Sequence, residues 1–267
     1  MVLMHIVEQL IAERATKLMA KRRLFRVVRP LLYRILAYDA AVFLADAMAD
    51  KTGHEAFEMV TNHISPRTAV QGLHNLPDNG RCIIISNHPT GLADGMAVFQ
   101  AIRDKRPEHV YLANADALRV IPKGEDIIIP VEWVKTKRNH TKTRETLISM
   151  RDALEQEKCI VIFPSGRLAK LGWRGLVEQS WESSAAMVAR KYNAPIIPLN
   201  IKARNSWLYY LFSKISGELR DITLFQELLN KKGVVFNLTF GDPIDPATLP
   251  KNAENATARV RRTVEML

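Results

Sequence analysis

Residues 81–95, with the sequence RCIIISNHPTGLADG, hold the pattern that decides the fold. The apolar run Cys82–Ile85 has the length and the β-branched content of a buried strand, and turn-forming residues follow it directly. His88 stands where this strand ends, and Asp94 comes six positions later, just before a helix-like segment. In open α/β sheets, ligands bind at the carboxyl ends of the strands. We therefore expect His88 and Asp94 to act as a base and its orienting partner, although Asp94 could also simply cap the helix.

The segments around this stretch alternate between strand-like and helix-like patterns. Further strands are expected at 109–113, 126–131, 158–163, 195–201 and 234–240, with helices at 95–104, 141–156, 180–192 and 253–267. Such alternation indicates parallel βαβ units. The predicted fold is therefore of the α/β class, with a mainly parallel twisted sheet flanked by helices. The turn-rich residues 65–80 are expected to lead into the sheet, and the last helix is expected to be a solvated cap.

The N-terminal segment, residues 1–64, is expected to be helical, and the α/β domain is expected to span residues 65–267. One helical stripe in the first segment consists of Arg22, Arg26, Arg29 and Tyr33. Apolar residues cover much of the rest of this helix, and Pro30 should start a new helix or kink this one. A basic amphipathic segment can lie in a membrane interface, but it can also pack on its own domain with a solvated basic face. The pattern alone favours neither arrangement.

The charge of the chain narrows the class of partner. The 267 residues carry a formal net charge of +10, and residues 1–36 hold eight Lys or Arg against two Glu. This balance favours an anionic partner, either an acidic membrane surface or a nucleic acid. No apolar stretch approaches the roughly 18 residues of a membrane-spanning helix, and the N-terminus lacks the pattern of a secretory signal. The two cysteines lie in apolar runs typical of buried thiols in a reducing compartment, so a cytoplasmic protein is expected.

A second loop of interest follows another apolar strand, in the sequence IVIFPSGRLAK of residues 160–170. A glycine-containing loop after a strand exposes backbone N–H groups, and Arg167 can bind a phosphate or carboxylate through two hydrogen bonds. Arg174 lies close by in the sequence. An ordinary turn with a surface arginine would show the same pattern. Ser165 is not in a G-x-S-x-G elbow, because Phe163 occupies the first glycine position, so a serine hydrolase is not expected.

Three ordered blocks of the sequence resemble the motifs of the glycerolipid acyltransferase family, best known for its lysophosphatidic-acid acyltransferases. The family patterns are N-H-x4-D, F-P-E-G-T-R and V-P-I-V-P, and the corresponding blocks are NHPTGLAD at 87–94, FPSGR at 163–167 and APIIPL at 194–199. In the third block, Pro195 and Pro198 are expected to shape a strand edge and could form the wall of an acyl pocket. The resemblance covers about residues 75–245.

The resemblance implies an O-acyltransferase that moves a fatty acyl group from acyl-CoA or acyl-carrier protein to the hydroxyl of a lysophospholipid of the 1-acylglycerol-3-phosphate type. His88 and Asp94 form the HxxxxxD motif of this chain, in which His88 would be the general base. Gly166 and Arg167 would help to hold the acceptor phosphate. The substrate-binding candidates are Gly91, Ser165, Gly166, Arg167 and Arg174. No metal is implied, and no cofactor beyond the acyl donor.

A lipid acceptor also bears on the N-terminal segment. Because such an acceptor lies in a bilayer, the resemblance implies that the basic helix docks on an anionic membrane surface. We therefore expect a peripheral protein on the inner face of the cell membrane, with an N-terminal helical membrane-docking element. A nucleic-acid partner is not expected, because no basic patch interleaved with aromatic residues lies outside the N-terminal helices.

Three departures from the family pattern leave the acceptor open. Five residues separate His88 from Asp94, where the family has four. Ser165 stands where the family has glutamate, and the threonine before Arg167 is missing. The chain resembles the hemolysin-like and ornithine-lipid acyltransferases in its longer spacing, so a lyso-ornithine lipid is an alternative acceptor. A non-catalytic lipid-binding protein of the same fold is a further alternative.

Overall fold

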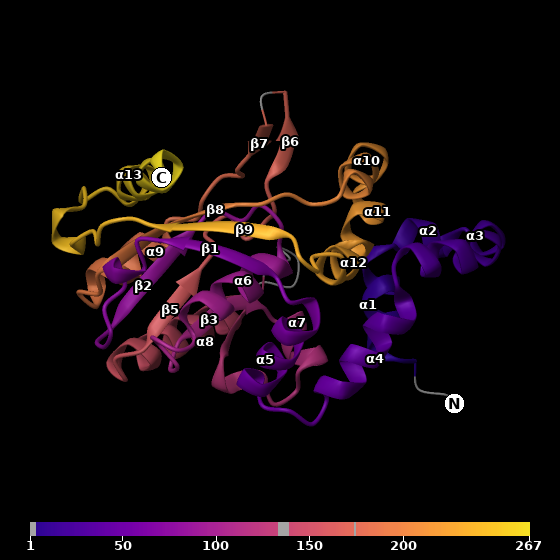
Figure 1. Ribbon diagram of the computed structural model, residues 1–267, viewed down its shortest axis with the longest axis horizontal. Coiled ribbons are helices and arrows are strands. Elements are labelled where there is room, and N and C mark those ends of the chain that lie inside the picture. The colour runs from indigo at the N-terminus through magenta and orange to yellow at the C-terminus, as the bar shows by residue number, and fades with distance from the viewer. Residues whose placement is uncertain (1–3, 133–138, 174) are drawn as a thin grey trace.

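A mainly parallel sheet forms the centre of the protein, as seen in a computed structural model that describes residues 4–132, 139–173 and 175–267 (Figure 1). Within these residues the sheet has seven strands in the order β1-β9-β8-β2-β5-β3-β4. They are β1 (Arg67–Gln71), β2 (Cys82–Ser86), β3 (Val110–Asn114), β4 (Ile128–Val131), β5 (Cys159–Ile162), β8 (Ile196–Lys202) and β9 (Val235–Phe240). Every neighbouring pair is parallel except β8 and β9. The predicted fold class is confirmed.

Helices cover both faces of the sheet and explain the continuous apolar run in β2. They are α5 (Gly53–Ile64) and α6 (Leu92–Ile102) on one face, and α8 (His140–Glu155), α9 (Ser184–Lys191) and α13 (Ala253–Met266) on the other. Along β2, Cys82 and Ile84 belong to the first core, whereas Ile83 and Ile85 belong to the second. A strand that is covered on both faces has to be apolar at successive positions.

Two expectations for the sheet are wrong. Residues 67–71, expected to be part of a connection, form the edge strand β1, which pairs with β9 alone. An edge strand with one half-exposed face needs no apolar run, and for this reason its sequence looks like a loop. Pro198, expected at a strand edge, lies inside the central strand β8. The antiparallel ladder with β9 begins one residue later, at Leu199, so no position of that ladder needs an N–H from Pro198.

The C-terminal helix α13 is also not the expected solvated cap. Val260 and Val264 are fully buried, and the Val264 carbonyl accepts a hydrogen bond of 2.6 Å from Asn200 in β8. Arg261 donates to the carbonyls of Gln179 and Glu178, at 3.1 and 3.3 Å. The helix therefore holds the segment that enters α9 against the body of the protein.

Several shorter elements connect these layers, and the sequence patterns do not indicate them. The helices are α7 (Asp116–Val120), α10 (Trp207–Ile215), α11 (Gly217–Ile222) and α12 (Leu224–Leu229), with 3-10 turns at η1 (Leu73–Asn75), η2 (Gly124–Asp126) and η3 (Pro246–Thr248). The antiparallel strands β6 (Lys170–Gly172) and β7 (Gly175–Val177) form a separate hairpin. This hairpin lies between β5 and α9 in the chain, and in Figure 1 it extends away from the sheet at the top of the view.

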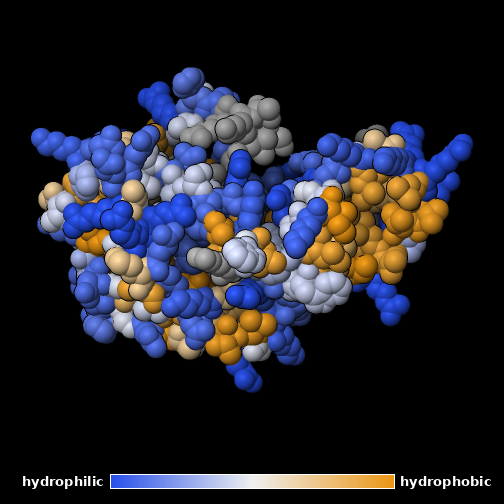
Figure 2. Space-filling view, turned by 90° about the horizontal axis from the view of Figure 1, so that it is seen from above, coloured by the Kyte–Doolittle hydropathy of each residue, from blue (hydrophilic) through white to orange (hydrophobic). Residues whose placement is uncertain are grey.

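The N-terminal helices form an end of the molecule that projects beyond the sheet (Figure 1). They are α1 (Ile6–Arg14), α2 (Thr16–Ala20), α3 (Arg22–Ile35) and α4 (Tyr38–Met48). Pro30 lies inside α3, which continues through it, so the predicted restart of the helix is wrong. In α3, Leu24, Val27 and Leu31 face outward, and Val27 is 78% exposed. Figure 2 shows hydrophobic side chains gathered on this projecting end.

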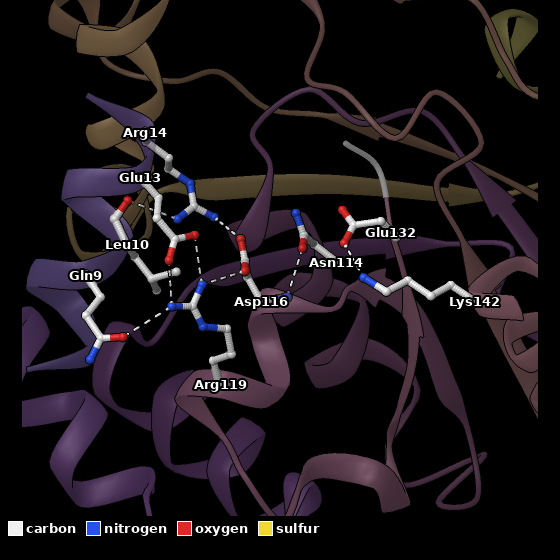
Figure 3. A network of polar contacts seen from close by, with 9 residues as sticks. All are labelled: Gln9, Leu10, Glu13, Arg14, Asn114, Asp116, Arg119, Glu132 and Lys142. Carbon is white, nitrogen blue, oxygen red and sulfur yellow. Dashed lines mark hydrogen bonds and ion pairs between the residues drawn. The ribbon is translucent and has the colours of Figure 1, made fainter. Parts of the chain in front are cut away.

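A network of ion pairs fastens α1 to α7, which follows the carboxyl end of β3 (Figure 3). Arg14 contacts Asp116 at 2.7 Å, and Arg119 contacts Glu13 at 2.8 Å and Asp116 at 3.1 Å. Leu10 of α1 is buried in the same core as α5 and α6. The N-terminal helices are therefore held at the carboxyl edge of the sheet. Among the described residues, no helix combines the length and the apolar character needed to cross a membrane.

Candidate active site

The structure brings His88 and Asp94 together at the carboxyl end of β2. The His88 Nδ1 atom lies 3.0 Å from Asp94 Oδ2, an ion-pair distance, but the two groups are not aligned as a hydrogen bond. The Asp94 carboxylate is fully buried and accepts hydrogen bonds from the Thr90 and Gly91 amides, at 2.8 and 2.9 Å, and from the Thr90 hydroxyl. Three donors from one short loop therefore fix the orientation of this carboxylate. Asp94 also stands in the first turn of α6, so the predicted orienting role and the capping role coincide in one side chain.

Gly91 makes the five-residue spacing possible. Its φ is +85°, in the left-handed region that favours glycine, and this conformation folds the loop so that Asp94 faces His88. Leu168 packs directly on Gly91, because a Cβ built there would lie 3.0 Å from a Leu168 methyl group. Gly91 therefore shapes the site through its backbone.

The His88 ring presents one nitrogen to a possible substrate. Its face stacks on Phe163, with ring centroids 4.3 Å apart and planes 25° apart. The side chain is 17% exposed, and Nε2 has no hydrogen-bond partner within the described part of the chain. When Nδ1 carries the proton that faces Asp94, the lone pair of Nε2 is free to accept a proton. This arrangement meets the geometric requirement of a general base.

Strand β8 and the loop after β5 hold the His88 loop in place. The Asn87 side chain makes two hydrogen bonds with the backbone of Ile201 in β8, at 2.9 and 2.7 Å. On the other side, the Ala169 amide donates to the His88 carbonyl at 3.0 Å. The loops after β2 and β5 therefore meet beside the carboxyl-terminal end of β8.

The substrate-binding candidates after β5 lie in the loop that contacts His88. Ser165 is buried, and its hydroxyl donates to the Arg167 carbonyl at 2.7 Å. Gly166 has a φ of +54°. Arg167 is exposed and forms no ion pair with any described residue, so its guanidinium is available to an anion. Arg174 lies outside the described residues.

Glu178 contacts the backbone of His88, and the sequence does not indicate this contact. One of its carboxylate oxygens, Oε2, accepts a hydrogen bond of 3.2 Å from the His88 amide. Burial raises the pKa of Glu178, and the hydrogen bond from the His88 amide partly offsets this effect. No motif marks Glu178, because the β6–β7 hairpin separates it from the second block. Only its position thirteen residues after Ser165, before the helix α9, could have drawn attention to it.

Asn205 adds an unpartnered amide at the same edge. It follows β8, is 7% exposed, and the oxygen and nitrogen of its side chain have no partner among the described residues. The Tyr210 hydroxyl accepts a hydrogen bond from the Asn205 backbone amide at 3.2 Å, and burial is the main reason that the pKa of Tyr210 is raised. No motif in the sequence marks either residue.

A cavity opens beside the end of β5, between α8 and α9. Its volume is about 230 Å³, and its apolar lining includes Leu112, Met150, Ile162 and Pro164. Pro164 directly follows Phe163, on which the His88 ring stacks. Pro195 and Pro198 do not line this cavity, so the suggestion that the third block forms the wall of a pocket does not hold for it.

Comparisons with known proteins agree with these features. The family model for acyltransferases matches residues 67–202. The lyso-glycine lipid O-acyltransferase of Phocaeicola vulgatus is 26% identical over 217 residues, which cover 79% of this chain and 75% of that protein. The lyso-glycine lipid O-acyltransferase of Bacteroides thetaiotaomicron is 22% identical over 229 residues, covering 83% and 82%.

A solved structure is also similar in part. The crystal structure of the 1-acyl-sn-glycerophosphate acyltransferase PlsC from Thermotoga maritima is 16% identical and covers 96% of this chain and 97% of its own, with a TM-score of 0.48. The assignment does not depend on this likeness, because the family model alone matches just over half of the chain. The protein therefore belongs to the acyltransferase family, as one of its glycerolipid acyltransferases, and is an O-acyltransferase.

Proposed function

We propose that the protein transfers a fatty acyl group from a thioester donor, acyl-CoA or acyl-carrier protein, to the hydroxyl of a lysolipid. The observation that carries this proposal is the open Nε2 of His88, whose other ring nitrogen faces a fully buried carboxylate. The oxygen of the acceptor hydroxyl attacks the carbonyl carbon of the thioester while Nε2 of His88 takes the hydroxyl proton. The C–S bond then breaks, and the thiol leaves with the proton from His88. Such general-base assistance contributes about 10²–10⁴ in rate.

A lyso-aminolipid is the acceptor class that the comparisons favour. Two similar proteins are named for lyso-glycine lipid, and the present chain has Ser165 where the motif for lysophosphatidic-acid enzymes has glutamate. The exposed Arg167, in the loop beside His88, would bind an anionic headgroup such as the carboxylate of an amino acid. The same arginine would bind a phosphate, so 1-acylglycerol-3-phosphate is the second candidate acceptor.

We place the enzyme on an anionic membrane surface, at the inner face of the cell membrane. In α3 the arginines lie beside the outward-facing Leu24, Val27 and Leu31, and this combination suits a membrane interface. Each Lys or Arg near an anionic surface contributes about 1 kcal/mol to binding. Since α1 is fastened at the carboxyl edge of the sheet, docking through α3 would keep the His88 edge close to the lipid.

The test is acyl transfer by the purified full-length protein. It is incubated with acyl-CoA, or in a separate reaction with acyl-carrier protein, and with vesicles that contain one lysolipid each: lyso-glycine lipid, lyso-ornithine lipid or 1-acylglycerol-3-phosphate. Mass spectrometry of the diacylated products identifies donor and acceptor together. We expect product from a lyso-aminolipid with the wild type and a loss of about 10²–10⁴ in rate with His88→Ala. Equal rates for His88→Ala and the wild type would exclude the mechanism, and no product from any acceptor would exclude the function.

A further inference from the structure

The segment between β5 and α9 leaves the site and returns to it. It departs at Pro164, and the Glu182 amide closes the excursion by donating to the Pro164 carbonyl at 3.0 Å. The β6–β7 hairpin lies within this excursion, and Glu178 comes directly after β7. Arg261 of α13 donates hydrogen bonds to the Glu178 and Gln179 carbonyls and so holds the segment that follows β7. The position of Glu178 is therefore set by closure of the excursion and by α13.

Residues 164–182, between β5 and α9, form hydrogen bonds with both the N–H and the carbonyl of His88. The Glu178 carboxylate accepts the His88 N–H at 3.2 Å, and the Ala169 N–H donates to the His88 carbonyl at 3.0 Å. The direction of the imidazole depends on the backbone that carries it. A shift of about 1 Å in a reacting group can reduce the rate on the order of 10²-fold.

The surroundings of Glu178 do not favour its presence for stability alone. Its second oxygen, Oε1, is buried and has no hydrogen-bond partner among the residues that the structure describes. The other oxygen, Oε2, accepts the His88 N–H. A buried carboxylate oxygen without a hydrogen bond is costly, and such groups call for an explanation in function.

We propose that Glu178 is a positioning residue of this acyltransferase, one that takes the place of the glutamate that the family's second block carries where this chain has Ser165. Ser165 and Glu178 are neighbours in space although thirteen positions separate them in sequence. The Ser165 hydroxyl is engaged within its own loop, by the Arg167 carbonyl, and the segment after the hairpin supplies the carboxylate that accepts the His88 N–H. This inference rests on the proposed function, because Glu178 would act by orienting the His88 ring toward the acceptor hydroxyl.

The test measures kcat and KM for acyl transfer in the full-length protein carrying Glu178→Ala, Glu178→Gln or Ser165→Glu/Glu178→Ala. Glu178→Ala removes the acceptor of the His88 N–H, and we expect kcat to fall about tenfold to a hundredfold with both KM values unchanged. Glu178→Gln retains an oxygen that accepts this hydrogen bond, so it should recover most of the loss. The double variant returns a carboxylate to the family position and should recover part of it. Glu254→Ala, on the exposed side of α13, is the matched control and should behave as the wild type.

Wild-type kcat in Glu178→Ala would overturn the proposal, as would an equal loss in Glu178→Ala and Glu178→Gln. A double variant no faster than Glu178→Ala would overturn the equivalence with the family glutamate. If Glu178→Ala does not fold, the comparison of Glu178→Gln with Ser165→Glu/Glu178→Ala decides, and both must then turn over substrate. These outcomes differ from failure of the proposed function, in which the wild type itself forms no product.

Discussion

Among the described residues, two histidine–aspartate pairs that use Nδ1 have the same separation and different surroundings. In both His88–Asp94 and His54–Asp126, the distance from Nδ1 to the carboxylate oxygen is 3.0 Å. The Nε2 atom of His54 also contacts the Pro107 carbonyl, at 2.8 Å, whereas the Nε2 atom of His88 has no partner among the described residues. A ring with an acceptor at each nitrogen cannot take a proton from a substrate. The open nitrogen, and not the distance to the aspartate, distinguishes a candidate base from a structural pair.

The position of each pair relative to the sheet explains the difference. His88 follows the carboxyl end of β2, while His54 begins α5 and contacts the segment that precedes β3, at the amino edge. Burial would raise the pKa of Asp126, but hydrogen bonds from the His54 ring and from the His54 and Gly53 amides lower it overall. These bonds cap α5 and tie it to η2. The second pair therefore joins two elements of the fold.

The largest effect should come from removing each histidine in turn. His88→Ala should reduce kcat about 10²–10⁴-fold, because the acceptor hydroxyl loses its base. His54→Ala should leave kcat within a few fold and lower stability by about 1 kcal/mol, because it removes side-chain hydrogen bonds. Kinetics and urea unfolding on both variants check this. A catalytic loss in His54→Ala comparable to that in His88→Ala would remove the distinction between the pairs.

Replacing each aspartate by asparagine distinguishes the aspartate that orients a catalytic histidine from the one that joins α5 to η2. In Asp94→Asn the amide can direct its NH₂ group at Nδ1 and so favour the wrong tautomer, and we expect kcat to fall about 10³-fold. Asp126→Asn should keep its kcat and weaken the start of α5. The measurement is kcat/KM for both variants beside their unfolding midpoints. An active Asp94→Asn enzyme would show that the carboxylate is needed only as a cap for α6.

The carboxyl edge could be predicted because its residues carry local signals. The run Cys82–Ile85 is apolar at every position because helices cover β2 on both faces, and the loop after it must therefore emerge at a sheet edge. His88 and Asp94 come from one short loop, so their contact follows from local geometry once Gly91 adopts its positive φ. Short-range constraints of this kind are visible in a sequence.

Contacts that depend on distant segments could not be predicted in the same way. Glu178 reaches His88 only because a hairpin closes and Arg261 of α13 holds the returning strand. The strand β1 has no apolar run, because it pairs on one side only and is half exposed. The arginines of α13 suggested a solvated helix, although a valine stripe on its other face is buried. In each case the deciding interaction lies far away along the chain.

A third histidine extends the comparison to stability. His109 is fully buried at the start of β3, donates from Nδ1 to the Arg106 carbonyl at 2.6 Å, and has a pKa that burial lowers to about 4. Between pH 6.5 and pH 4 the unfolded chain therefore binds a proton that the native ring does not. Stability should fall as the pH decreases through this window, by about 3 kcal/mol in total from this group.

His109→Gln keeps a donor for the Arg106 carbonyl and does not titrate. We expect it to be less stable than the wild type at pH 7, with the difference shrinking toward pH 4. Urea unfolding at several pH values measures this, and His74→Gln, at an exposed position, should retain the wild-type slope. Parallel pH profiles for His109→Gln and the wild type would mean that folding does not lower the pKa of His109.

The smallest expected effect is on membrane binding, and it compares arginines in the two basic helices α3 and α13. Arg26 of α3 and Arg262 of α13 are both exposed, but Arg26 lies beside the outward-facing Leu24, Val27 and Leu31, on the projecting end where hydrophobic side chains gather (Figure 2). If α3 docks on the membrane, Arg26→Gln should weaken binding to anionic vesicles about fivefold, and Arg262→Gln should leave it unchanged. Sedimentation with phosphatidylglycerol vesicles measures the difference, which should shrink as salt is added because screening reduces the attraction. Equal losses for both arginines would show that the net charge of the chain, and not the α3 face, binds the membrane.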